Sequence, residues 1–124
     1  MKREIITTAR APRLSGSQAV KIGNLVFTSG YTGLDQDHKI VSPDVATQIR
    51  KTFEHLKTIL EAAGSGFNNV VEVTIFLREL SDREKYLNPI WNELFPVDAP
   101  ARTTVQAVMR SEMAVEIKMV AFVP

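Results

Sequence analysis

Hydrophobic and polar residues near the start of the chain form short runs that favour β-strands. These runs cover residues 4–7, 19–22 and 25–29. Gly23-Asn24 separates the last two runs, and such a pair is suited to a tight hairpin turn. The pattern therefore predicts two antiparallel strands joined at this turn, preceded by another short strand.

The hydrophobic period changes to a helical one after Ser42. Residues 42–44 (Ser-Pro-Asp) offer a cap, a first-turn proline and an acidic residue, and Gly64 ends the run. The apolar face of this predicted helix carries Ile49, Phe53, Leu56, Leu60 and Ala63.

After the predicted helix, apolar residues occupy every second position. One face of residues 71–77 is wholly apolar, and we expect it to pack under the helix because both need cover from water. This face carries Val71, Val73, Ile75 and Leu77.

A second helix is predicted from residues 81–84 (Ser-Asp-Arg-Glu), which match a capping box. An apolar face that contains Tyr86 and Trp91 follows at helical spacing. Pro89 lies inside this run, where it removes a backbone donor. The sequence leaves two outcomes open: a kink at Pro89, or a new short helix with Asn88 as its cap.

Two longer strands, at residues 101–108 and 114–123, end the chain and are predicted to form an antiparallel hairpin. The order of elements indicates one α+β domain over residues 1–124, with two helices on one face of a sheet. The other face of that sheet lacks a cover, which oligomerisation would supply.

The composition of the chain says little more about the fold, but it argues against several classes of partner and site. Hydrophobic residues make up 44% and charged residues 23% of the 124 residues, as in ordinary soluble domains. The net charge of +1 provides no broad positive field, so nucleic acid and membranes are not expected partners. The absence of cysteine and of a long apolar segment suits the cytoplasm, with a mitochondrial location left open. His38 and His55 are the only imidazoles, and no metal site is predicted.

Polar side chains interrupt the two C-terminal strands. Alternation places Arg102 and Thr104 on one face of the first strand, and Glu116 and Lys118 on one face of the second. A buried arginine is costly unless it is paired, and its planar fork binds carboxylates bidentately. The residues alone leave two interpretations open: an internal ion pair of Arg102 with Glu116 or Glu93, or a site for a ligand carboxylate.

Residues 100–105 (Pro-Ala-Arg-Thr-Thr-Val), followed by Val-Glu-Ile at residues 115–117, resemble the C-terminal signature of the YjgF/Rid family, the reactive-intermediate deaminases. Residues 23–30 are similar to the family's early strand, and residues 60–64 to the end of its first helix. Asn88 matches an asparagine in its second helix. These segments occur in the family's order along nearly the whole chain.

The resemblance implies a chorismate-mutase-like α+β fold that assembles as a homotrimer, with sites in the clefts between subunits. By residue-by-residue correspondence, the carboxylate-binding arginine of the family is Arg102. Its acidic residue, which handles water and protons, is Glu116. Ser29, Asn88 and Thr104 match further substrate-binding positions, although Ser29 also suits a turn and Asn88 a helix cap.

Several positions depart from the family pattern. Gly16 stands where many family deaminases have tyrosine, and Tyr31 is either its replacement in the site or a packing residue. Thr104 replaces a frequent cysteine, and the resemblance implies that this position acts largely through its backbone amide. Lys118 replaces the usual second glutamate, and residues 110–112 (Arg-Ser-Glu) replace the usual Leu-Pro turn with one residue fewer. These departures bear on the choice of substrate more than on the fold.

The resemblance also implies a reaction. Family deaminases hydrolyse imino or enamino acids, such as 2-aminoacrylate, 2-iminopropanoate and 2-iminobutanoate, to 2-oxo acids and ammonia, without a metal or organic cofactor. Arg102 would orient the substrate carboxylate and Glu116 would polarise water. Two other functions are weighed: a non-catalytic trimer that binds a small metabolite as a regulator, and an L-PSP-type ribonuclease. Near-neutral charge argues against the ribonuclease.

Overall fold

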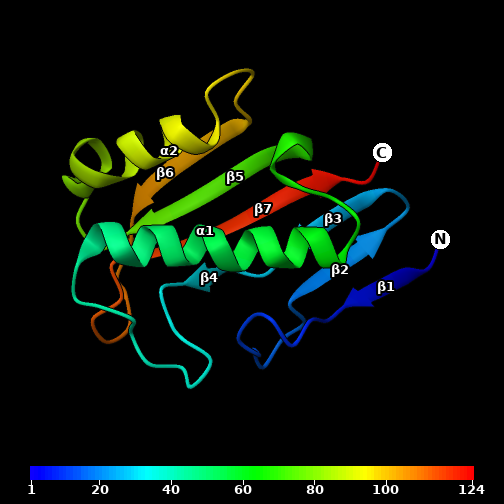
Figure 1. Cartoon of the computed structure of the whole chain (residues 1–124), viewed down its shortest axis with the longest axis horizontal. Coiled ribbons are helices and arrows are strands. Elements are labelled where there is room, and N and C mark those ends of the chain that lie inside the picture. The colour runs from blue at the N-terminus through cyan, green and yellow to red at the C-terminus, as the bar shows by residue number, and fades with distance from the viewer.

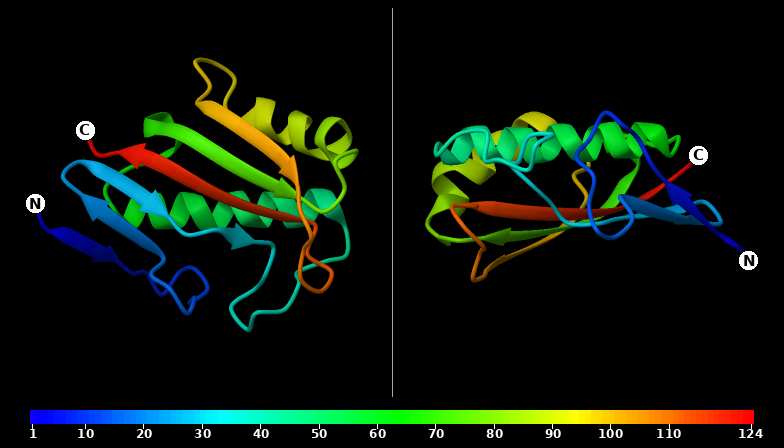
Figure 2. Two further views of the ribbon diagram at one scale, coloured as in Figure 1. Left: turned by 180° about the vertical axis from the view of Figure 1, so that it is seen from behind. Right: turned by 90° about the horizontal axis from the view of Figure 1, so that it is seen from below.

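A mixed β-sheet carries the helices of the chain on one of its faces (Figure 1; Figure 2, right). The computed structural model describes all residues, 1–124. The strands lie in the order β1-β2-β3-β7-β5-β6, and β4 pairs with β7 in line with β3. They are β1 (Arg3–Ile6), β2 (Ala19–Ile22), β3 (Leu25–Thr28), β4 (Tyr31–Thr32), β5 (Val70–Leu77), β6 (Ala101–Gln106) and β7 (Val115–Phe122).

Two α-helices cover the sheet, with two shorter turns beside them. The long helix α1 crosses the centre of the sheet, and α2 lies beside β6 (Figure 1). The α+β prediction with two helices on one face is therefore confirmed. The helical elements are α1 (Val45–Ala62), η1 (Phe67–Asn69), the π-helical turn η2 (Arg83–Leu87) and α2 (Asn88–Leu94).

The predicted hairpin and first helix are present, with one correction. β2 and β3 pair antiparallel around Gly23, whose φ of 58° is the left-handed conformation that such turns need. Helix α1 begins at Val45 rather than after Ser42, because the cap is Asp44, whose carboxylate accepts from the Thr47 amide. The helix ends as predicted before Gly64, with φ of 85°.

The core lies between α1 and the sheet. The apolar face of α1 packs on alternate residues of β5 and β7, and each fully buried large aliphatic side chain there stabilises the fold by about 1.5–3 kcal/mol. Val71 was predicted to join this face and does not, because a β-bulge between Val70 and Glu72 turns its side chain outward, 49% exposed. Buried strand residues include Val70, Val73, Ile75, Leu77, Val115, Ile117, Met119 and Ala121.

The last two strands do not form a hairpin, contrary to the prediction. β5 lies between them and pairs parallel with β6 and antiparallel with β7. The intervening loop crosses the end of β5, where the Arg78 guanidinium donates to the carbonyls of Met109, Ser111 and Met113. These bonds fix the loop across the strand end and so stabilise the crossover instead of a tight turn.

The sheet face opposite the helices has no cover within the chain (Figure 2, right). Ile5, Leu25 and Phe27 lie on it, each 39–48% exposed. Alternation puts Glu116 and Lys118 of β7 on this face as well, since their neighbours Val115, Ile117 and Met119 are buried under α1. This surface is called the open face below.

Candidate functional site

Arg102 lies on the helix-covered face of the sheet, beside α2. It pairs in register with Val73, whose side chain is fully buried, so both side chains point toward the helices. Its Nε donates to Thr104 Oγ1 and its Nη2 to Asn88 Oδ1, both at 2.8 Å. The guanidinium also lies 5.0 Å from the centre of the Trp91 ring. The side chain is thus fixed on three sides.

The position of Asn88 depends on the π-helical turn before it. The alternative with Asn88 as a cap is wrong: η2 runs directly into α2, whose N-cap is Leu87, and Asn88 is itself helical, with φ −61° and ψ −40°. The kink at Pro89 stays a prediction. The wider π turn accommodates Pro89, which lacks an amide hydrogen and crowds the preceding turn. The predicted capping box at residues 81–84 is absent: the cap is Asp82, which makes no capping bond, and Glu84 pairs with Arg83 instead. Asn88 is therefore free to accept from Arg102 and caps nothing.

Arg102 has no acidic partner. Glu93, one proposed partner, pairs with Arg50 at 2.9 Å, and Glu116, the other, lies on the open face. Burial lowers the pKa of Arg102, and the nearby charge of Arg83 lowers it further, while the charge of Glu84, which pairs with Arg83, acts in the opposite direction. The predicted internal ion pair of Arg102 is thus wrong, and some N–H groups of this partly buried guanidinium have no acceptor within the chain.

Glu116 lies on the open face at a break in the strands beside it. Between the pairs Phe27–Val120 and Tyr31–Ile117, three residues (28–30) face two (118–119), so the chain bulges there. A Cβ at Gly30 would come within 2.5 Å of Glu116 Oε2. Glycine at this position therefore makes room for the carboxylate.

A cavity of about 350 Å³ adjoins this carboxylate. Gly30, Thr32 and Glu116 line it, and Thr32 pairs in register with Glu116. Gly30 and Thr32 were not among the predicted site residues, although the Ser-Gly pair directly after a strand was a usable signal for a bulge.

Ser29 lies in the same bulge, next to Gly30. Its hydroxyl donates to the Ser17 carbonyl and its amide to the Gln18 carbonyl. These bonds join the bulge to the segment that contains Gly16. A Cβ at Gly16 would meet no atom within 4 Å, so the position is open to solvent.

Tyr31 does not join the other predicted residues. Its side chain is 2% exposed, its hydroxyl donates to the Pro12 carbonyl at 2.9 Å, and its ring packs on His55. Burial raises the pKa of Tyr31 to about 12. The Tyr31 side chain is thus packed and hydrogen-bonded in the core, on the side of the sheet opposite Glu116.

The predicted site residues therefore form two groups on opposite faces of the sheet. Arg102, Thr104 and Asn88 meet on the helix-covered face, joined by Trp91, which was predicted only as part of an apolar helix face. The spacing of Asn88 and Trp91, three residues apart on a helix, was the available signal. Glu116 and Ser29 lie at the bulge on the other side. No group of three or more His, Cys, Asp or Glu residues is arranged to bind a metal, and no helix is long and apolar enough to cross a membrane.

Comparison with known proteins gives consistent matches over nearly the whole chain. The profile of the family described as Endoribonuclease L-PSP matches residues 7–123. A human protein named 2-iminobutanoate/2-iminopropanoate deaminase is 35% identical over 96% of this chain and 89% of its own length. A RutC family protein from Pyrococcus abyssi is 36% identical over 98% of both chains. The crystal structure of RidA from an Antarctic Psychrobacter superposes with a TM-score of 0.88 at 35% identity, over 96% of this chain and 98% of that one.

Proposed function

The chain belongs to the YjgF/RutC/Rid family, also described as Endoribonuclease L-PSP, and from this premise we propose that it hydrolyses reactive imines or enamines of amino acids. The proposed substrates are 2-aminoacrylate, 2-iminopropanoate and 2-iminobutanoate, and the products are 2-oxo acids and ammonia. The name of the human relative supports this reaction class. The observation that carries the proposal is the Arg102 guanidinium, held in place without an acidic partner.

Arg102 is the proposed carboxylate-binding residue. A guanidinium has five N–H donors, and Thr104 and Asn88 take one each. The others remain for the substrate carboxylate, which would replace the acid that the chain does not supply. Because the Trp91 ring and two hydrogen bonds already orient the fork, less side-chain freedom is lost on binding.

Glu116 is the proposed acid/base. In the reaction, a water oxygen bonds to the imine carbon while one water proton passes to the nitrogen, which gives a carbinolamine. The hydroxyl proton of the carbinolamine then also passes to the nitrogen, and the carbon–nitrogen bond breaks to give the 2-oxo acid and ammonia. Glu116 takes a proton from the attacking water and returns it to the leaving nitrogen, a role that contributes about 10²–10⁴-fold. Ser29 and the Thr104 amide complete the proposed contacts with water or substrate. An enamine first gains a proton at carbon, and no electrons are exchanged, so no redox cofactor takes part.

The two groups act on one substrate only if neighbouring copies of the chain bring them together. Arg102 and Glu116 point to opposite faces of one sheet, so we infer a site between subunits of a chorismate-mutase-like homotrimer built from this single 124-residue unit. The exposed Leu25 and Phe27 on the open face support burial against another copy. The cytoplasm is the proposed compartment, with the mitochondrion as the alternative.

The proposal is tested by generating 2-iminobutanoate in place with an amino-acid oxidase in the presence of semicarbazide. An active deaminase diverts the imine from semicarbazide to 2-oxobutanoate, and Arg102→Ala does not. Diversion by the wild type alone supports the proposal, whereas equal diversion by both proteins contradicts the assigned site.

A second candidate is a non-catalytic trimer that binds a small carboxylate. Gly16 favours it, since the position that carries a phenol in many family deaminases is open here. Binding of 2-oxobutanoate without turnover of any imine would select this candidate. We do not propose a ribonuclease, because His55 is buried and donates its Nε2–H to the Leu34 carbonyl. The exposed His38 therefore has no second histidine with which to form an acid/base pair.

A further inference from the structure

Arg110 lines the same cavity as Glu116, Gly30 and Thr32. It lies in the loop between β6 and β7, where the chain departs from the family's usual Leu-Pro turn. Arg102 points to the opposite face of the sheet. Arg110 therefore adds a second cation to the proposed site, and it lies on the face that carries the acid.

The loop holds the Arg110 backbone in place. Arg78 donates to the carbonyls on both sides of it, those of Met109 and Ser111. Buried Gln48 donates to the Glu112 carbonyl and accepts from the Ala114 amide, which joins the loop to α1. The cation is thus carried by an anchored loop, although its side chain extends into solvent.

Arg110 forms no ion pair with an acidic residue. The ion pairs of the chain are Arg50–Glu93, Lys51–Glu54 and Arg83–Glu84, and neither Arg110 nor Glu116 takes part in them. A cation and a carboxylate thus line one cavity without neutralising each other. A ligand that carried a second carboxylate would pair with the cation, and Arg110 would offset the repulsion from Glu116.

Resting on the proposed function, we propose that Arg110 selects imines that carry a second carboxylate, those formed from acidic amino acids. Arg102 of a neighbouring copy binds the carboxylate next to the imine carbon, and Arg110 binds the distal one. The reaction is the same hydrolysis. The second cation changes which imine is preferred and takes no part in the proton transfers.

The test compares 2-iminoglutarate with 2-iminobutanoate, each generated by an amino-acid oxidase in the presence of semicarbazide. The wild type is expected to favour the dicarboxylate about tenfold in kcat/KM. Arg110→Gln is expected to raise KM for 2-iminoglutarate about tenfold and to leave kcat and all constants for 2-iminobutanoate within about twofold. Arg110→Lys should restore part of the preference, since it keeps the charge.

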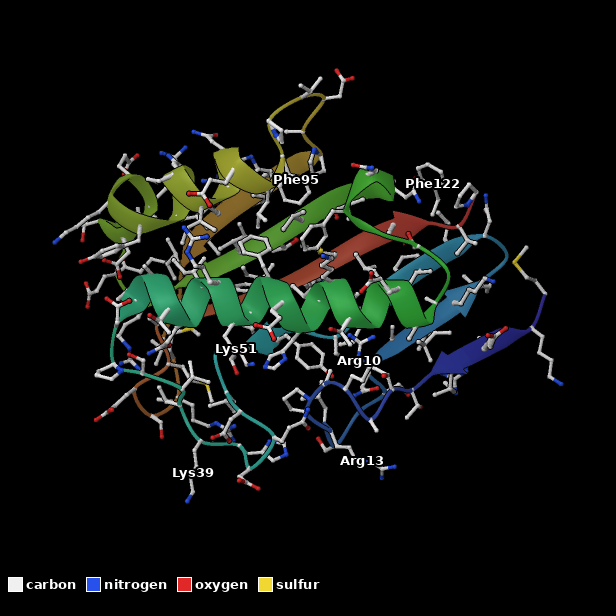
Figure 3. The ribbon with its side chains drawn as sticks, in the orientation of Figure 1. Arg10, Arg13, Lys39, Lys51, Phe95 and Phe122 are labelled. Carbon is white, nitrogen blue, oxygen red and sulfur yellow. The ribbon has the colours of Figure 1, made fainter.

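Arg10→Gln is the matched control, because it removes the same charge from the loop between β1 and β2 (Figure 3) and does not line this cavity. It should leave both substrates unaffected. If the wild type hydrolyses 2-iminobutanoate while Arg110→Gln leaves the ratio of kcat/KM for the two substrates unchanged, that result overturns this inference and leaves the proposed function standing. Failure of the wild type to hydrolyse either imine would overturn the proposed function, and this inference with it.

Discussion

The two faces of the sheet present their charged residues in different ways. On the helix-covered face, Arg102 is held by Thr104, Asn88 and the ring of Trp91. On the open face, Glu116 makes no ion pair and lies against a bulge made possible by Gly30. In the proposed site, the rigid, packed environment of Arg102 orients the substrate, and the carboxylate on the open face transfers protons. The proposal requires both faces.

The largest effect is expected from Arg102→Ala. Removal of a partly buried, hydrogen-bonded charge that pairs with a ligand costs about 2–5 kcal/mol, so kcat/KM should fall about a thousandfold and binding of 2-oxobutanoate should be lost with it. Arg50→Ala is the matched control, because it removes an exposed arginine and its surface ion pair. Turnover by semicarbazide competition and 2-oxobutanoate binding by calorimetry measure both effects. Equal loss in the two variants would show that the helix-covered face has no special role.

Glu116→Gln should separate the two faces most clearly. The amide keeps the shape of the side chain and removes its basicity, so kcat should fall about a hundredfold. Binding of 2-oxobutanoate should stay within about threefold of the wild type, because Arg102 is untouched. If binding fell as far as turnover, the assignment of orientation to one face and proton transfer to the other would fail.

A smaller effect on the open face is expected from Gly30→Ala. The new methyl group would lie within 2.5 Å of Glu116 Oε2, and the flexible carboxylate would turn away from it. We expect kcat to fall about tenfold, since a small displacement of a catalytic group is costly. Gly66→Ala, where a Cβ meets nothing within 4 Å, is the control. Unchanged kcat in Gly30→Ala would indicate that the position of the carboxylate at the bulge is not needed.

The smallest effect is expected on the helix-covered face, from Asn88→Ala. It removes one acceptor from Arg102 and costs about 1 kcal/mol, so KM for 2-iminobutanoate should rise about fivefold with little change in kcat. Asn92→Ala, an exposed residue on the same helix, is the matched control and should change neither constant. A rise in KM of the same size in both variants would attribute the effect to the helix and remove Asn88 from the site.

Elements with strong local signals were predictable from the sequence. The hairpin at Gly23 and the helix that ends at Gly64 follow from glycine conformation and hydrophobic spacing. The pairing of β6 and β7 was not predictable in this way, because it depends on β5 inserting between them and on Arg78 reaching three carbonyls of the loop. Non-local pairing leaves little trace in a local pattern.

In the candidate site, too, local features were predictable from the sequence and non-local ones were not. Alternation correctly put Arg102 with Thr104 and grouped Glu116 with Lys118, since side chains alternate along any strand. It did not place the two strands relative to each other, so the ion pair between Arg102 and Glu116 remained an open alternative. Asn88 could be read as a cap because the π turn before it has no clear sequence signal.

A site shared between neighbouring copies can be tested by mixing the Arg102→Ala and Glu116→Gln variants, each expected to be inactive or nearly so alone, and refolding them together. If each site takes Arg102 from one copy and Glu116 from its neighbour, random equal mixing should restore about a quarter of the wild-type activity, one half times one half. If both residues act within one chain, no mixed assembly contains a complete site. Activity no higher than that of the separate variants, when wild type refolded in the same way is active, would contradict a site built from the two faces of neighbouring copies.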